Sequence, residues 1–233
     1  MDKNLANLEK KLGVSFKDQN FLKSSLVHRS YLNEHKNFSL DHNERLEFLG
    51  DAVLELVVTD YLFKNYSEPE GVLTNWRSSL VNREQLSDQA EVLGLYDWLY
   101  MSRGESQDNN KKARSYILAN AFEAVIGAIY LDQGYAATDK FIQDNLIVNL
   151  KQIIDDKTYI DSKTSFQEKA QEILGITPSY RVLSESGPDH NKRFVVGIYL
   201  EKKLIAEGEG YSKQEAQTDA ATNALSVKDW KNQ

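Results

Sequence analysis

The chain has 233 residues, of which 41% are hydrophobic and 27% charged, and its net charge of −7 means that any nucleic-acid surface must be a local basic patch. The absence of cysteine excludes disulfides, thiolate metal sites and thiol nucleophiles, and agrees with a reducing cytoplasm. Because no apolar run is long enough to span a bilayer and the first residues lack a secretory signal, we expect a cytoplasmic protein with no membrane partner.

The first 150 or so residues repeat apolar side chains at spacings of three and four, which predicts one helix after another. The repeats include Leu5, Leu8 and Leu12; Leu22 and Leu26; Leu46, Leu49, Val53 and Leu56; Leu86, Ala90 and Leu93; Ile117, Ala121 and Ala124. Polar stretches at 33–43, 67–71 and 102–114 predict breaks between helices. We therefore expect an all-α domain over residues 1–157.

One predicted helix follows Asp41 or Asn43, either of which can cap its start. Glu44, Glu47 and Asp51 recur at i, i+3 and i+7, so three carboxylates share one face. The flanking residues are apolar, namely Leu46, Leu49, Ala52, Val53 and Leu56. A largely buried helix is therefore expected, with a cationic group compensating the acids.

Two sources of that compensation stay open. Arg45, Arg77 or a lysine can form a structural ion pair with the acids. The alternative is a metal ion, favoured by a second apolar helix over 115–131 that carries Asn120 and Glu123. Gly127, one turn further on, allows another helix to approach closely. Oxygen ligands on two facing helices suit Mg²⁺ or Mn²⁺, whereas zinc is disfavoured because thiolates and paired histidines are missing.

The pattern changes near residue 160 and predicts a second, small α+β domain over 158–233, with its core at about 161–227. A helix is expected over 162–174, and Pro178 prevents its continuation. Strands are expected over 180–185 and 193–200, because apolar and polar residues alternate there, and a turn at 201–203 leads to a third strand over 204–208. Tyr211 and Ser212 then open an alanine-rich helix, which gives the order α-β-β-β-α.

The block Asn43-Glu44-Arg45-Leu46-Glu47-Phe48-Leu49-Gly50-Asp51-Ala52-Val53-Leu54 resembles the signature of the ribonuclease III family. Other segments agree with that family across nearly the whole chain. They are Leu12-Gly13 with Phe16, His28-Arg29-Ser30-Tyr31, Glu70-Gly71 with Leu73, Leu80-Val81-Asn82-Arg83, Leu93-Gly94-Leu95 and Ala121-Phe122-Glu123-Ala124-Val125-Ile126-Gly127-Ala128.

The resemblance implies a homodimeric, Mg²⁺-dependent endoribonuclease that cuts double-stranded RNA to 5′-phosphate and 3′-hydroxyl ends, without an organic cofactor. Its substrates would be rRNA precursors and other structured transcripts, including mRNA and tRNA precursors, and Mn²⁺ should replace Mg²⁺. The implied metal ligands are Glu47, Asp51, Asn120 and Glu123, of which Asp51 and Glu123 would be catalytic. The family most often has aspartate at position 120, so Asn120 should weaken metal binding.

Three further residues receive roles from the same resemblance. Phe48 would insert into the partner subunit, although an ordinary core phenylalanine is the alternative. Glu70 would help position the RNA, although a solvated loop glutamate is nearly as good an interpretation. Glu44 would support the acidic face as a secondary residue.

The second domain resembles a double-stranded RNA-binding domain. On its first helix, Thr164, Gln167 and Glu168 suit 2′-hydroxyls and base edges, and the loop over 187–192 would bring His190 into a neighbouring minor groove. Lys213, at the start of the last helix, would contact phosphate. Solvated helix residues and a lone surface lysine are the alternatives. Gln214 stands where a second lysine is common, which should weaken phosphate contacts.

Two competing functions follow from the same residues. Asn120 motivates a nuclease-dead protein that binds double-stranded RNA, although the intact Glu47, Asp51 and Glu123 oppose it. A structural helical protein, whose acids form only ion pairs, is the other alternative.

Overall fold

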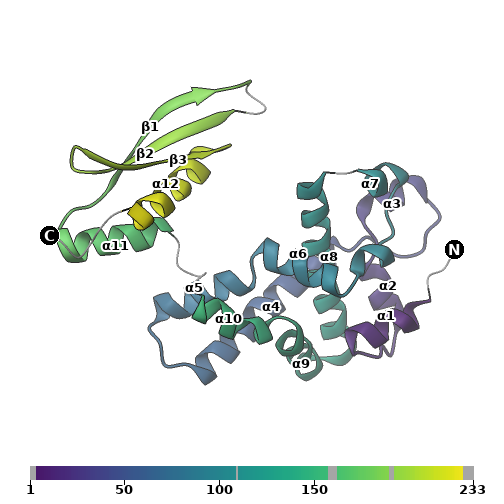
Figure 1. The fold of residues 1–233 in the computed structure, drawn as a ribbon. Helices are drawn as coiled ribbons and strands as arrows, with labels where there is room; N and C mark the ends of the chain where they lie inside the picture. The colour runs from purple at the N-terminus through teal and green to yellow at the C-terminus, as the bar shows by residue number, and fades with distance from the viewer. Residues whose placement is uncertain (1–3, 109, 157–161, 189–191, 228–233) are drawn as a thin grey trace. The chain divides into compact units, whose positions relative to one another are not determined.

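The computed structural model describes residues 4–108, 110–156, 162–188 and 192–227. The chain divides into two compact units, Met1–Tyr159 and Ile160–Gln233. The first is helical and the second combines helices with a sheet, so the expected fold class is confirmed (Figure 1). Within the described ranges, no helix combines the length and apolar character needed to cross a membrane.

The helical unit is a succession of α-helices with two short 3₁₀ turns. In chain order these are α1 (Leu5–Leu12), α2 (Gln19–Ser25), α3 (Arg29–Glu34), α4 (Glu44–Asn65), α5 (Glu70–Leu80), α6 (Arg83–Val92), η1 (Leu95–Trp98), α7 (Arg103–Gln107), α8 (Lys111–Gln133), α9 (Tyr135–Asn145), η2 (Ile147–Asn149) and α10 (Leu150–Asp155). One apolar core draws residues from all of them except α7, and α8 lies at its centre with ten buried residues.

Helices α4 and α8 pack backbone to backbone where two glycines face the opposite helix. A Cβ added to Gly50 would lie 1.8 Å from the Glu123 carbonyl oxygen, and one added to Gly127 would lie 2.2 Å from the Leu46 carbonyl oxygen. Both distances are far inside van der Waals contact, so only glycine permits this approach. The expectation that Gly127 admits a neighbouring helix is confirmed.

The second unit consists of α11 (Ser162–Leu174), β1 (Ser179–Ser186), β2 (Arg193–Leu200), β3 (Lys203–Gly210) and α12 (Lys213–Val227). The strands form an antiparallel sheet in the order β1-β2-β3, and α12 packs on β2 and β3 (Figure 1). Phe166, Ala170, Ile198 and the alanines of α12 are buried between helices and sheet. The predicted helix at 162–174 and the three strands are confirmed, with the outer strands slightly longer than expected.

Several local expectations were wrong. The stretch 102–114 is not a continuous break, because it contains α7 and the start of α8. Helix α5 begins at Glu70, inside the break expected at 67–71. Asn43 takes the N-cap position of α4 but makes no side-chain cap; its amide is buried and donates to the Ser25 carbonyl oxygen.

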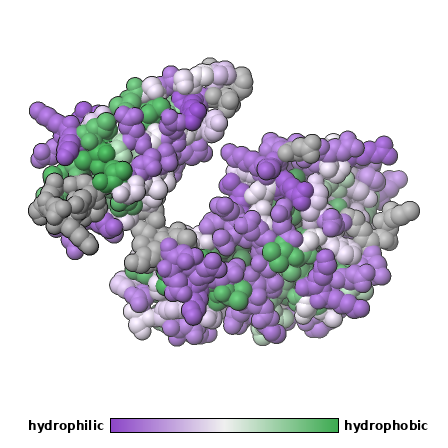
Figure 2. Space-filling view, viewed as in Figure 1, coloured by the Kyte–Doolittle hydropathy of each residue, from purple (hydrophilic) through white to green (hydrophobic). Residues whose placement is uncertain are grey.

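Helix α4 is also less buried than its apolar sequence suggests. Leu56 is 57% exposed, Phe48 is 81% exposed and Phe63 is 80% exposed. These three residues recur at i, i+8 and i+15, so they lie within one sector of the helix surface. We call them the α4 apolar stripe. Figure 2 shows that the visible face of the helical unit is mostly hydrophilic with separate hydrophobic patches.

Candidate metal centre and nucleic-acid interface

Helices α4 and α8 bring together the four residues that the sequence singled out as metal ligands. Glu47 and Asp51 lie one turn apart near the start of α4, and Asn120 and Glu123 lie one turn apart on α8. The Asn120 amide donates a hydrogen bond to the Glu47 carboxylate, and Glu123 interacts electrostatically with Asp51 and Glu47. We call this group the α4–α8 cluster.

Burial and mutual repulsion of its carboxylates strain the cluster electrostatically. Burial, followed by the charges of Asp51 and Glu47, raises the pKa of Glu123 to about 7. Burial and the neighbouring Glu44 carboxylate raise the pKa of Glu47, against the effect of the Asn120 hydrogen bond. Each shift has the sign expected when acids approach one another in a partly dry site.

Among the described residues, no basic side chain forms an ion pair with Glu47, Asp51 or Glu123 that would relieve this strain. Arg77 instead pairs with Glu55, its Nε lying 2.9 Å from the glutamate Oε2, and it donates to Thr59. Among the described residues, Glu47, Asp51 and Glu123 form no ion pair, so the ion-pair expectation involving Arg77 was wrong. The oxygen donors and uncompensated negative charge fit a hard divalent cation.

The cluster is not a closed cage. Within the part of the chain that the structure describes, no three histidine, cysteine, aspartate or glutamate side chains are arranged to hold a metal as they stand. Repulsion among the three carboxylates favours keeping them apart from one another. Asn120 supplies the fourth oxygen donor without adding charge.

The residues expected around the acidic face take different positions. Glu44 is exposed and contacts Arg29, whose Nη1 lies 3.5 Å from the glutamate Oε1. Glu70 begins α5, so it is not a loop residue; its carboxylate accepts a hydrogen bond from Thr74 and lines a hollow of about 550 Å³ beside Phe63 and Arg77. Phe48 is exposed, so the alternative of an ordinary core residue within this chain was wrong.

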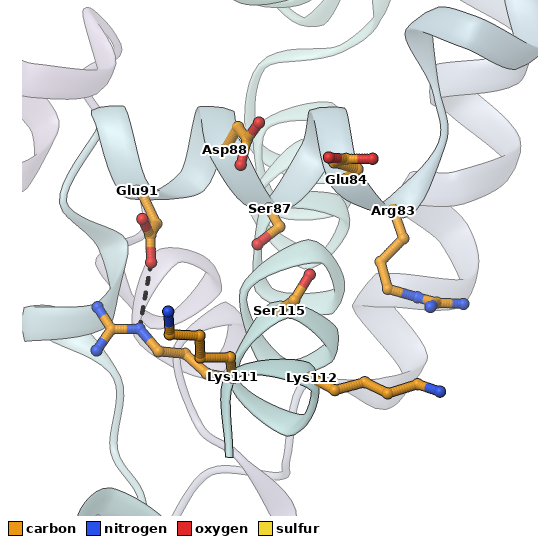
Figure 3. A pocket seen from close by; sticks show the side chains of 9 residues that line it. Arg83, Glu84, Ser87, Asp88, Glu91, Lys111, Lys112 and Ser115 are labelled. Carbon is orange, nitrogen blue, oxygen red and sulfur yellow. Dashed lines mark hydrogen bonds and ion pairs between the residues drawn. The ribbon is translucent and has the colours of Figure 1, made fainter. Parts of the chain in front are cut away.

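A larger hollow of about 720 Å³ lies between α6 and the start of α8, and no residue of the α4–α8 cluster lines it (Figure 3). Sequence reasoning missed it, although the adjacent Lys111 and Lys112 were a signal. Arg83 and Lys112 border it, but so do Glu84 and Asp88, and Arg114 is engaged with Glu91 at 3.2 Å. Its charges are mixed, so it resembles neither a divalent-cation site nor a strongly basic patch.

The second unit presents most of its predicted contact residues to solvent. Thr164, Gln167 and Glu168 are exposed on α11, and Lys213 is exposed at the first position of α12. His190 lies outside the described residues. Sequence reasoning missed Glu185 on β1, which pairs with both Lys192 and Lys213.

Comparisons with sequence families divide the chain in the same way. The model of the family described as Ribonuclease-III-like matches residues 18–150, and that of the double-stranded RNA binding motif matches residues 162–228. A protein named Ribonuclease 3 from Nitratiruptor sp. is 43% identical over 226 residues, covering 97% of both chains. Another Ribonuclease 3, from Carboxydothermus hydrogenoformans, is 44% identical over 229 residues and also covers 97% of each chain.

Solved structures agree for the helical unit. The ribonuclease III nuclease domain from Campylobacter jejuni matches in two structures, with TM-scores of 0.53 and 0.54 at 40% and 38% identity. These matches cover 61% and 64% of this chain and 98% and 97% of the other. The first of them is described as showing structural flexibility in a region involved in dimer formation.

Proposed function

The chain belongs to the ribonuclease III family of endoribonucleases that act on double-stranded RNA, and we propose that it is a Mg²⁺-dependent enzyme producing 5′-phosphate and 3′-hydroxyl ends. Its proposed substrates are rRNA precursors and other structured transcripts, including those of mRNA and tRNA. We place the activity in the cytoplasm, with Mn²⁺ able to replace Mg²⁺ and no organic cofactor.

The α4–α8 cluster carries this proposal, because it gathers three uncompensated carboxylates and one amide at a close helix contact. Glu47, Asp51, Asn120 and Glu123 would hold the ion. A bound divalent ion supplies an activated water and stabilises the charge that develops on the scissile phosphate. Asp51 and Glu123 would hold the ion in one position on the protein, because the close backbone contacts at Gly50 and Gly127 keep α4 and α8 in register.

Asn120 has a second task in this arrangement. Because its NH₂ group donates to Glu47, its carbonyl oxygen is left to accept or to ligate. The amide therefore orients Glu47 while contributing a neutral donor. With Asn120 the site has three carboxylates, whereas a site with aspartate at position 120 would have four. It should therefore bind Mg²⁺ more weakly, but it keeps Asp51 and Glu123, the two carboxylates proposed as catalytic.

We propose a homodimer in which each subunit cuts one strand. The α4 apolar stripe supports this assembly, because an exposed row containing two phenylalanines suits a protein interface. Phe48 directly follows Glu47 in the chain, so dimer contact and metal centre would share one turn of α4. The Campylobacter jejuni nuclease domain is described as having a region involved in dimer formation, which supports assembly as a dimer.

The second unit would hold the duplex by its backbone. Thr164, Gln167 and Glu168 would reach the minor groove, His190 would enter the next one, and Lys213 would contact a phosphate between them. The exposed positions of the α11 residues and Lys213 support this assignment. Glu70 and Glu44 would act as secondary residues near the bound RNA.

Cleavage of duplex RNA by the full chain tests the proposal, with wild type compared with Glu123→Gln. We expect Mg²⁺-dependent cleavage by wild type and at least about a 100-fold lower rate for the variant, with RNA binding changed less than about twofold. Ligating the products with and without prior phosphatase treatment identifies their ends. Binding without cleavage, in both Mg²⁺ and Mn²⁺, would support the second candidate that Asn120 motivates, an RNA-binding protein without nuclease activity.

A further inference from the structure

Glu185 lies between two lysines at one edge of the second unit. Its Oε2 lies 3.0 Å from the Nζ of Lys192, and its Oε1 lies 3.6 Å from the Nζ of Lys213. The hydrogen bond from Lys192, together with the charges of both lysines, lowers the pKa of the Glu185 carboxyl. One ionised carboxylate therefore bridges two ammonium groups that come from different segments of the chain.

The fold determines this juxtaposition. Glu185 is near the end of β1 and pairs in register with Phe194 at the start of β2. Both ammonium groups lie near the Phe194 ring, with Nζ atoms 6.0 Å (Lys192) and 5.7 Å (Lys213) from its centroid. Lys213 reaches this place from the first turn of α12. We call Glu185, Lys192, Phe194 and Lys213 the β1–α12 cluster.

A carboxylate held between two ammonium groups takes up the same charges and hydrogen-bond donors that would otherwise be available to an RNA phosphate. We propose that Glu185 acts as an internal substitute for phosphate, which competes with duplex RNA for Lys213 and Lys192 and sets a low affinity and shallow salt dependence. This inference rests on the proposed phosphate contact of Lys213.

The charge balance of the β1–α12 cluster determines how much the salt dependence of RNA binding should change. Two lysines without an acid would present two positive charges to the backbone, whereas the β1–α12 cluster presents one. Each phosphate neutralised by a protein changes the slope of log K against log salt by about 0.9 on a duplex. Removing the Glu185 charge should therefore steepen that slope by close to one unit. Because the pairs are exposed, the gain in affinity should be modest.

Equilibrium binding of the full chain to duplex RNA tests the inference, in EDTA to prevent cleavage and over a series of salt concentrations. We expect Glu185→Gln to lower Kd by about threefold to fivefold at low salt and to steepen the slope by about one unit. Glu207→Gln is the matched control, because it removes an equal charge from an exposed residue of β3 that pairs with no described basic side chain. It should change Kd by less than about twofold.

A double-mutant cycle links the effect to the lysine. In a Lys213→Ala background, Glu185→Gln should give a clearly smaller gain. The inference is overturned if Glu185→Gln matches the Glu207→Gln control or weakens binding, since Glu185 would then be neutral or would position the lysines. If Lys213→Ala alone leaves Kd unchanged, the proposed phosphate contact fails as well. Cleavage of duplex RNA by wild type remains an independent test of the proposed function.

Discussion

Glu123 shows what the spacing of residues predicts and what it omits. The spacing places Asn120 and Glu123 on one side of a helix, and Glu47 and Asp51 on one side of another. It does not determine that the two sides meet, which depends on packing between segments about 70 residues apart in the chain. Glycines offered a local signal, since Gly127 was expected to admit a helix. The buried amide of Asn43 had no such signal, because its partner Ser25 belongs to another helix.

The raised pKa of Glu123 predicts a pH-dependent stability. The folded state holds a proton up to a pKa of about 7, whereas the ordinary pKa is 4.5, so folding favours the protonated form. The folded protein therefore loses stability as pH rises from about 4.5 to 7. Glu123→Gln removes that loss, and because the carboxyl is only partly shielded, we expect the free energy of unfolding at about pH 8 to rise by roughly 1–2 kcal/mol.

Urea unfolding at about pH 8 and about pH 4.5, without divalent ions, measures this difference. The two proteins should converge at the lower pH, where both side chains are neutral. A variant equally stable or less stable at pH 8 would show that the Glu123 carboxylate is compensated in the folded chain.

At the scale of elements, helices and strands were predicted better than their boundaries. Apolar periodicity located α4 and α8 because both contact the core over many turns. It could not locate α7, a five-residue helix without buried residues. Periodicity also predicted too much burial for α4. The sequence pattern of an apolar side chain is the same whether that side chain packs inside its own chain or lies on the surface, where another chain could cover it. Phe48 and Leu56 are examples.

The close contact of α4 with α8 predicts a severe effect for Gly50→Ala. The added Cβ would meet the Glu123 backbone at 1.8 Å, and backbone cannot rotate away as a side chain can. We expect a loss of about 3 kcal/mol or more in the free energy of unfolding, measured with urea. Any folded fraction should also gain less thermal stability from Mg²⁺, because the helices that carry the ligands are pushed apart.

Gly71→Ala is the matched control for that variant. Gly71 lies in the first turn of α5, where an added Cβ would meet nothing within 4 Å. The free energy of unfolding of the Gly71→Ala variant should stay the same as that of wild type or rise by about 0.5 kcal/mol. Equal losses in the two variants would contradict the packing argument.

At the scale of the molecule, a net charge of −7 and a double-stranded RNA partner are compatible because charge is distributed locally. Carboxylates at the α4–α8 contact favour a cation, while Glu185 offsets one of the two lysine charges near Phe194. Composition indicated only that a basic surface would be small. The change of pattern near residue 160 predicted a helical part followed by a small α+β part, and the family matches at 18–150 and 162–228 agree with that order.

The α4 apolar stripe predicts a specific change in assembly. If the proposed dimer forms through this stripe, Phe48→Ala should raise its dissociation constant at least about tenfold, since the variant removes a large aromatic side chain from the interface. Sedimentation over a dilution series measures it. Val92→Ala on α6 is the control, because Val92 is 78% exposed yet lies outside the stripe. If both variants dimerise like wild type, or both weaken equally, the interface lies elsewhere.

The glycine contact between α4 and α8 also orders events during synthesis of the chain. Glu47 leaves the ribosome well before Glu123, and Glu47 and Asp51 have their complete α8 neighbours only after translation has passed Gln133. Domains generally form as units as they emerge, so the nascent protein passes through a stage in which α4 has been synthesised and α8 has not. The proposed metal centre thus forms only when α8 docks, and a chain truncated before that point should carry the acids of α4 without cleaving RNA.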